Sequence, residues 1–202
     1  MRLQQARRDY YRRLARREGY PSRAAFKLMQ LDDKYKIIKK GATILDIGCS
    51  PGGWSKVACE RVGNAGLVVG IDITPPTFKH DRFVFIKSDI ADVLPERITE
   101  YSKQYDVALS DISPNITGIW ELDNGRQIEL SKIAFRLACK VLKKGGSCIF
   151  KAFQGEFTDE LISVLKPCFQ RVTISKPEAS RKQSSEIYLV CLNFVNSPPE
   201  WN

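Results

Sequence analysis

The chain has 202 residues, of which 43% are hydrophobic and 27% are charged, which is enough for one core and predicts a single domain over 1–202. Its formal net charge of +9 favours a polyanionic partner. Membrane-spanning, secreted and disulfide-stabilised proteins are excluded. No apolar run could cross a bilayer, the N-terminus lacks the apolar segment of a signal peptide, and the six cysteines form no C-x-x-C pair. We therefore expect a protein of the reducing cytoplasm.

The N-terminal part of the chain predicts two helices. Residues 2–18 are polar and compatible with a helix, and residues 19–22 (Gly-Tyr-Pro-Ser) interrupt it. Ser22 is the predicted N-cap of a second helix, which carries Lys27 beside an apolar stripe.

Positive charge is concentrated in these first helices and in one late loop. Tyr10 and Tyr11 lie among the arginines, which suits RNA better than bulk solvent, although a solvated basic face is the alternative. We expect 1–40 to face RNA and 41–202 to form a catalytic core, with a second basic segment at 176–183. The N-terminal arginines are Arg2, Arg7, Arg8, Arg12, Arg13, Arg16 and Arg17.

A strand, a glycine-rich turn and a helix follow one another from Thr43. The run Thr43–Ile47 is β-branched and apolar, Gly48-Cys49-Ser50-Pro51-Gly52-Gly53 follows at once, and apolar residues recur at helical spacing from Trp54. Such an element typically holds a nucleotide-like ligand, and glycines let a ligand approach the main chain. Ser50 replaces the second glycine of the dinucleotide fingerprint, and there is no G-x-x-x-x-G-K-[ST] motif. A tight turn without a ligand is the alternative.

Strand-like and helix-like segments alternate along the rest of the chain. This predicts an α/β fold with a seven-stranded, mostly parallel sheet, helices on both faces, and an antiparallel hairpin at the C-terminal edge. A long helix is expected over 124–142, closed by Lys143-Lys144-Gly145-Gly146, and a shorter one over 157–165. The predicted strands are 43–47, 67–72, 83–86, 105–111, 147–150, 169–175 and 186–192.

Polar residues or glycine occur where the first five predicted strands end. Because ligands bind at the carboxyl ends of parallel strands, these positions predict one site. The acid after the second strand could accept hydrogen bonds from ribose hydroxyls, although strand-end acids also serve as ordinary turn residues. The positions are Gly48, Asp72, Asp89, Asp111 and Lys151.

Three motifs carry a resemblance to one family. They are D-I-G-C-S-P-G-G-W over 46–54, an acid after the second strand, and D-I-S-P-N over 111–115. The chain resembles, over nearly its whole length, the FtsJ/RlmE family of S-adenosylmethionine-dependent RNA 2'-O-methyltransferases. The resemblance implies a Rossmann-like methyltransferase fold, S-adenosyl-L-methionine as cofactor and RNA as partner. We expect a monomer with no metal and no membrane partner.

The resemblance also implies roles for individual residues. The family's Lys-Asp-Lys-Glu catalytic set is matched in order by Lys27, Asp111, Lys151 and Glu186. Gly52 and Trp54 would belong to the methionine pocket, Asp72 would bind the ribose, and Asp89 would accept from the adenine amino group. The full cofactor-binding set is Gly48, Gly52, Gly53, Trp54, Asp72, Asp89 and Asp111.

The chemistry requires a ribose hydroxyl to attack a sulfonium methyl in line. The methyl is already activated, so the enzyme must supply alignment and a group that takes the proton. We expect Lys151 to take it, with Lys27 as a neighbouring cation that favours the neutral amine, and Glu186 and Asp111 as groups that orient both amines. The alternative reading is a solvated Lys27 and a strand-end ion pair of Lys151 with Glu186.

Other enzyme classes find little support. The single histidine, His80, cannot build a metal cluster or a Ser-His-Asp triad, and there is no G-x-S-x-G elbow. An NAD-dependent dehydrogenase would keep Asp72 but lacks the glycine fingerprint. An RNA-binding protein that has lost its chemistry is the non-enzymatic alternative. The compact size resembles the ribosomal type within this family, and that resemblance implies a uridine 2'-hydroxyl of 23S ribosomal RNA as target, with the tRNA anticodon loop as runner-up.

Overall fold

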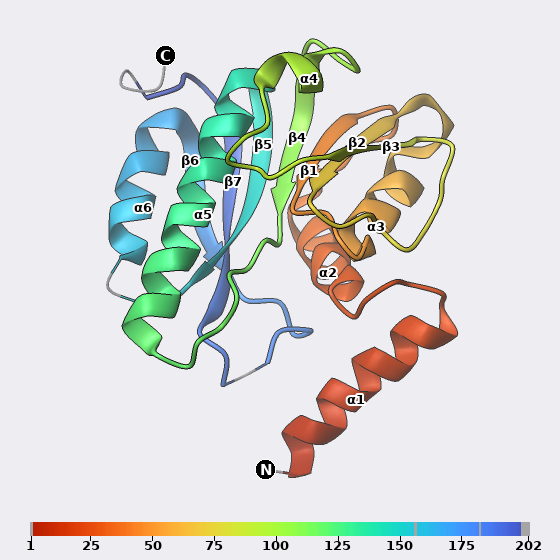
Figure 1. Ribbon diagram of the computed structural model, residues 1–202, viewed down its shortest axis with the longest axis vertical. Coiled ribbons are helices and arrows are strands. Elements are labelled where there is room, and N and C mark those ends of the chain that lie inside the picture. The colour runs from red at the N-terminus through yellow and green to blue at the C-terminus, as the bar shows by residue number, and fades with distance from the viewer. Residues whose placement is uncertain (1, 156, 182, 199–202) are drawn as a thin grey trace.

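Seven strands form one sheet in the computed structural model, which describes residues 2–155, 157–181 and 183–198, with side chains from Tyr10 onward (Figure 1). The strands are β1 (Thr43–Ile47), β2 (Leu67–Asp72), β3 (Phe83–Lys87), β4 (Tyr105–Ser110), β5 (Leu142–Phe153), β6 (Phe169–Ser175) and β7 (Glu186–Phe194).

The sheet has the order β3-β2-β1-β4-β5-β7-β6. Strands β1 to β5 are parallel, whereas β7 is antiparallel to both β5 and β6. The predicted mostly parallel sheet with an antiparallel C-terminal edge is therefore confirmed. Because β7 lies between β5 and β6, Glu186 at its start is brought next to the end of β5.

Helices cover both faces of the sheet, as Figure 1 shows. Helices α4, α5 and α6 pack on one face over a core that includes Phe135 and Phe150, and α2 and α3 pack on the other over a core that includes Leu28 and Ile44. Full burial of a side chain such as Leu28 contributes about 1.5–3 kcal/mol, which fixes the backbone beside Lys27. The helices are α1 (Arg2–Arg17), α2 (Ala25–Tyr35), α3 (Gly53–Val62), α4 (Pro95–Thr99), α5 (Trp120–Val141) and α6 (Thr158–Leu165).

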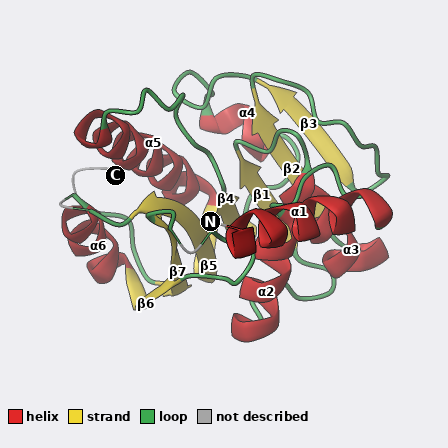
Figure 2. Cartoon of the chain, turned by 90° about the horizontal axis from the view of Figure 1, so that it is seen from below, coloured by secondary structure: helices red, strands yellow, loops and turns green. Residues whose placement is uncertain are grey.

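Helix α1 extends away from the sheet, and the view from below shows it crossing in front of α2 (Figure 2). Ala15 is 3% exposed and packs with Phe26 of α2 and Ala179 of the β6–β7 loop. The Tyr11 ring lies 5.4 Å from that of Phe26. The first helix is therefore attached to the rest of the molecule through its C-terminal half. No helix in the described part of the chain is long and apolar enough to cross a bilayer.

The predicted start of the second helix is wrong. Helix α2 begins at Ala25 rather than directly after Ser22, and no side chain caps it. The residues before it form short turns, in which the backbone N–H of Ala25 donates to Ser22 O at 3.3 Å. The Ser22 hydroxyl lies instead against the start of α3, since a Cβ on Gly53 would be 2.4 Å from Ser22 Oγ.

The boundary between the long helix and the fifth strand also differs from the prediction. Helix α5 starts four residues early, at Trp120, because the Asp123 carboxylate accepts from the backbone N–H of Thr117 and Gly118 and orders the preceding loop. It ends at Val141, and the expected glycine stop is part of β5. Lys143 forms an ion pair with Asp106 of β4, which draws this segment into the sheet.

Candidate active site

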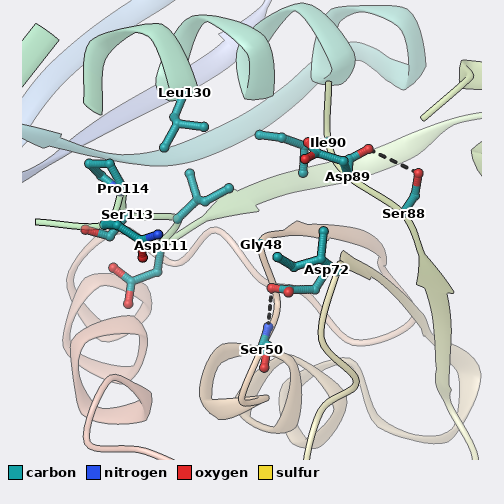
Figure 3. Close-up of a pocket in the computed structure, with 13 residues that line it drawn as sticks. Gly48, Ser50, Asp72, Ser88, Asp89, Ile90, Asp111, Ser113, Pro114 and Leu130 are labelled. Carbon is teal, nitrogen blue, oxygen red and sulfur yellow. Dashed lines mark hydrogen bonds between the residues drawn. The ribbon is translucent and has the colours of Figure 1, made fainter. Parts of the chain in front are cut away.

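The five predicted strand-end positions lie along one edge of the sheet. Gly48, Asp72, Asp89 and Asp111 line a pocket of about 440 Å³ (Figure 3). Lys151 lies beside Asp111. Side chains of Ile73, Ile90, Ile112 and Leu130 give the same pocket apolar walls. Because β1 to β4 run in parallel, their carboxyl ends meet here although the residues are far apart in sequence.

The first glycine of the turn contributes directly to the pocket. Gly48 has a φ of 75°, a conformation that favours glycine, and its backbone N–H donates to Ile71 O of β2 at 2.8 Å. A Cβ at this position would lie 2.8 Å from Ile112 Cβ. The missing side chain therefore lets the segment after β4 approach the turn.

The other predicted cofactor-binding residues of the turn pack against neighbouring side chains. Gly52 has a φ of 107°, and a Cβ on it would lie 2.4 Å from the ring of Phe78. Trp54 is 3% exposed, its indole N–H donates to Ala24 O at 2.9 Å, and its ring lies 5.6 Å from that of Tyr188. Gly52, Gly53 and Trp54 do not line the pocket. Trp54 therefore packs in the core between α2, α3 and the sheet, and the roles of Gly52 and Trp54 in a methionine pocket stay predictions.

The Asp72 carboxylate faces the pocket and also orders the turns around it. Asp72 Oδ2 accepts from the backbone N–H of Ser50 at 2.9 Å (Figure 3). Its Oδ1 accepts from the backbone N–H of Thr74, also at 2.9 Å. Each oxygen retains a lone pair for a further donor. The structure thus combines the two readings of this acid, a turn residue and a pocket residue.

Asp89 lies across the pocket from the glycine turn. Its Oδ1 accepts from the backbone N–H of Ala91 at 2.9 Å, and its carbonyl accepts from the Ser88 hydroxyl at 3.1 Å. The residue is exposed, so its second carboxylate oxygen is accessible from the pocket.

The predicted catalytic residues form a cluster of two amines and two carboxylates. Lys27 Nζ lies 2.8 Å from the Glu186 carboxylate and 3.9 Å from Asp111 Oδ1. Lys151 Nζ lies 3.6 Å from Asp111 Oδ1, 3.8 Å from Glu186 Oε2 and 3.3 Å from Asp111 O. The alternative of a solvated Lys27 is wrong, because only 7% of its side chain is exposed. Lys27 is thus held by a short ion pair, while Lys151 makes longer contacts and is the less constrained amine.

The charge on Glu186 is stabilised by this arrangement. Burial by itself would raise the pKa of Glu186, but the positive charges of Lys27 and Lys151 outweigh it, and the pKa is lower than usual. The Ser180 hydroxyl donates to Glu186 Oε1 at 2.8 Å and adds to this effect. The carboxylate is therefore ionised at neutral pH and can orient both lysines.

Tyr188 is a member of the cluster that the sequence reading missed. Burial, followed by the charges of Asp111 and Glu186, raises its pKa well above 10 and keeps the hydroxyl protonated. That hydroxyl donates to Asp111 Oδ1 at 2.7 Å. Alternation along β7 places Tyr188 on the same face as Glu186, two residues earlier, and this spacing could have indicated it. Ser180 lies in a loop and carries no comparable signal.

The two predicted basic segments meet beside this cluster. The Gln30 side chain of α2 accepts from the backbone N–H of Ala179 at 3.0 Å and donates to the Tyr11 hydroxyl at 3.1 Å, which joins the β6–β7 loop to α1. The arginines exposed on this side are Arg12, Arg13, Arg16, Arg17 and Arg181. The side chains of Arg2, Arg7 and Arg8, and all of Lys182, lie outside the described part of the chain.

Comparison with known proteins gives consistent matches over most of the chain. Curated relatives called ribosomal RNA large subunit methyltransferase E include one from Methanocaldococcus jannaschii, which is 43% identical over 95% of this chain and 80% of its own length. Another, from Archaeoglobus fulgidus, is 43% identical over 93% of this chain and 97% of its own.

Solved structures support the same grouping. A Plasmodium falciparum protein described as a ribosomal RNA methyltransferase aligns with a TM-score of 0.78 and 34% identity, over 88% of this chain and all of that one. A fibrillarin of Aeropyrum pernix, solved with bound S-adenosyl-L-methionine, aligns with a TM-score of 0.58 over 77% of this chain and 68% of that one. At 15% identity the fibrillarin shows the fold alone. Residues 20–194 match the sequence pattern of the FtsJ-like methyltransferase family, and the chain therefore belongs to this family.

Proposed function

We propose that this protein transfers a methyl group from S-adenosyl-L-methionine to a ribose 2'-hydroxyl of RNA, with a uridine of large-subunit ribosomal RNA as the favoured target. The observation that carries the proposal is the cluster of Lys27, Asp111, Lys151 and Glu186 at the edge of the pocket, in which both lysines are buried. The names of the curated relatives support the ribosomal target.

The pocket fits the proposed cofactor in size and chemistry. A volume of about 440 Å³ lies in the usual range for ligands of this size. Asp72 presents carboxylate lone pairs for ribose hydroxyls, Asp89 presents one for an exocyclic amine, and Ile90, Ile112 and Leu130 offer apolar contacts for a flat ring. When bound there, S-adenosyl-L-methionine supplies an activated methyl group.

The task of the protein's own residues is to align the hydroxyl and to remove its proton. As the ribose oxygen takes the methyl group, the methyl–sulfur bond would break and S-adenosyl-L-homocysteine would be the leaving group. The hydroxyl proton would pass to the amine of Lys151. Lys27 Nζ is held by its ion pair with Glu186 Oε1 at 2.8 Å and stays next to Lys151. Tyr188 holds the Asp111 carboxylate in place through its hydroxyl at 2.7 Å. A rigid arrangement of this kind lowers the barrier chiefly by orientation.

RNA would approach over the surface formed by α1 and the β6–β7 loop. The exposed arginines of α1 are suited to phosphate contacts. The apolar cluster of Ala15, Phe26 and Ala179 keeps the helix next to the loop that supplies Ser180 to the catalytic cluster. The basic surface and the catalytic cluster are therefore neighbours, and both would contact one substrate.

The test is a transfer assay combined with mapping of the product. Purified protein, radiolabelled cofactor and ribosomal RNA or large subunits from cells that lack the gene should give one site of 2'-O-methylation, detected as resistance of that linkage to alkaline hydrolysis. The same site should be unmethylated in total RNA from those cells. Labelling of tRNA in place of ribosomal RNA would redirect the target, and the absence of transfer to any cellular RNA would refute the proposal.

A further inference from the structure

The catalytic cluster lies where two neighbouring strands of the sheet separate. Strand β4 pairs with β5 as far as Ser110, opposite Phe150, and then departs with Asp111. Strand β5 continues and pairs on its other side with β7, where Lys151 lies opposite Tyr188. The separation opens the pocket, but it leaves backbone carbonyls at both strand ends without a partner in the sheet.

Two buried side chains of α5 fill this gap. Gln127 is 0% exposed, and its Nε2 lies 3.2 Å from Ile112 O and 3.3 Å from Lys151 O. Ser131 is 2% exposed, and its Oγ lies 2.9 Å from Lys151 O and 2.8 Å from Gln127 O. A hydroxyl has a single proton, whereas an amide nitrogen has two. Gln127 is therefore the residue that can bond to both separated strands at once.

The positions of these two carbonyls set the geometry of the cluster. The Lys151 carbonyl belongs to the residue whose amine lies 3.6 Å from Asp111 Oδ1, and Ile112 directly follows Asp111. Ile112 also lines the pocket and lies where a Cβ on Gly48 would be only 2.8 Å away. A shift of Ile112 relative to Lys151 would therefore alter both the pocket wall and the distance between amine and carboxylate.

We infer that Gln127 is a positioning residue for methyl transfer, which holds Lys151 at a fixed distance from the Asp111–Ile112 segment through its amide. This rests on the proposed function, because it assigns to Lys151 the role given above. Gln127 acts through backbone carbonyls and lies beneath the reacting groups.

Gln127→Met tests this inference, because methionine keeps the length of the side chain and removes both N–H donors. Ile128→Val is the matched control: Ile128 is the next residue of α5, is 2% exposed and belongs to the core on that face. Both variants should lower Tm. Only Gln127→Met should reduce the single-turnover rate of methyl transfer, by about 10-fold or more, because small misplacements of reacting groups cost up to about 100-fold. The dissociation constant for RNA should stay close to wild type, and that for the cofactor should change less than the rate, because only Ile112 of the pocket wall is affected. Ser131→Ala should have a smaller effect on the rate.

A second readout separates this inference from the proposed function. The Cε–Hε NMR signal of Lys151, assigned in lysine-labelled protein by its loss in Lys151→Arg, should shift in Gln127→Met and stay in place in Ile128→Val. That shift would show that Gln127 positions Lys151 even if the wild-type protein transfers no methyl group, an outcome that would refute the proposed function separately. An unchanged signal, or equal rates for Gln127→Met and Ile128→Val at equal Tm, would show that Gln127 only stabilises the fold.

Discussion

The two lysines of the catalytic cluster have different surroundings. Lys27 comes from a helix and makes a 2.8 Å contact with Glu186, whereas Lys151 ends the parallel part of a central strand and makes contacts of 3.3 to 3.8 Å. Both amines are largely buried. Because removing one partner of a buried ion pair leaves an uncompensated charge, each substitution must be judged against its effect on stability.

Lys151→Arg should reduce the single-turnover rate of methyl transfer by about 100-fold or more, because arginine keeps the charge but does not release its proton in a protein. Dissociation constants for cofactor and RNA, measured by calorimetry and by filter binding, should change little. A near-normal rate would show that alignment alone drives the reaction. Lys132→Arg is a suitable control, since Lys132 lies on α5 and pairs with Glu129 and Glu160 away from the pocket.

Asp72→Ala should weaken binding of S-adenosyl-L-methionine. The loss of charge-assisted hydrogen bonds corresponds to about 1.5–3 kcal/mol, or roughly 10-fold to 150-fold in the dissociation constant measured by calorimetry. Release of the Ser50 and Thr74 N–H groups would contribute to the loss. Asp92→Ala is the control, because this acid lies close in sequence to Asp89 but does not line the pocket. Equal affinity in both variants would remove Asp72 from the cofactor site.

Asp46 should make folding stability depend on pH. Its Oδ2 accepts from the Ser55 hydroxyl at 2.5 Å, but burial, assisted by the charges of Asp111 and Asp72, raises its pKa from 3.8 to about 7. A raised pKa means that the stabilisation is complete below pH 3.8 and is lost as pH rises towards about 7.

The effect of Asp46 can be measured as the free energy of unfolding in urea at pH 5 and pH 8. Wild-type protein should lose on the order of 1–3 kcal/mol more than Asp46→Asn over this interval, since one unit of pKa shift corresponds to about 1.4 kcal/mol. Asparagine cannot ionise and can still accept from Ser55. The same pH dependence in both proteins would contradict the buried ionisation.

At the scale of elements, helix α1 combines a fixed position with exposed arginines. Its C-terminal half is fixed by Ala15, Tyr11 and their contacts with Phe26, while the arginines of that half are exposed to solvent. A helix that serves only as a solvated face would not need to be joined to the β6–β7 loop through Gln30. This attachment favours the interpretation of α1 as an RNA-binding element.

Replacing Arg12, Arg13 and Arg16 with glutamine should weaken RNA binding mainly at low salt. The slope of log affinity against log salt concentration should flatten by about 0.7 for each lost phosphate contact on single-stranded RNA, or about 2 for three contacts. Cofactor affinity should remain unchanged. Replacement of Arg97, Arg136 and Lys140, on the face covered by α4 and α5, gives a variant of equal net charge. If both variants show the same slope, α1 has no specific role.

At the scale of the whole molecule, the parallel sheet collects the reactive groups and the antiparallel edge completes them. Strands β1 to β4 supply the pocket, β5 supplies Lys151, and β7 supplies Glu186 and Tyr188. Helix α2 adds Lys27 from outside the sheet. Four elements therefore meet at the cluster, namely the end of β4, β5, β7 and α2. Each of them is fixed by its own core contacts.

The sequence by itself determined the fold class and the five strand-end positions, while the resemblance to the family pointed to Lys27 and Glu186. It could do so because alternating strands and helices dictate a parallel sheet, and a parallel sheet brings the carboxyl ends of its strands to one edge. The glycine turn could also be predicted from local sequence, because Gly48 has a positive φ and a neighbouring segment packs closely against it.

Only the tertiary structure decided which turn residues face the pocket and what holds the cluster together. Trp54, Gly52 and Gly53 pack against Tyr188, Phe78 and Ser22, respectively. These partners are 26 to 134 residues away, and no local pattern reveals them. The extension of β5 back to Leu142 depends on Asp106 of a neighbouring strand. Likewise, Gln127 became visible only once β4 and β5 were seen to separate, because its two acceptors are brought together by the sheet and not by the sequence.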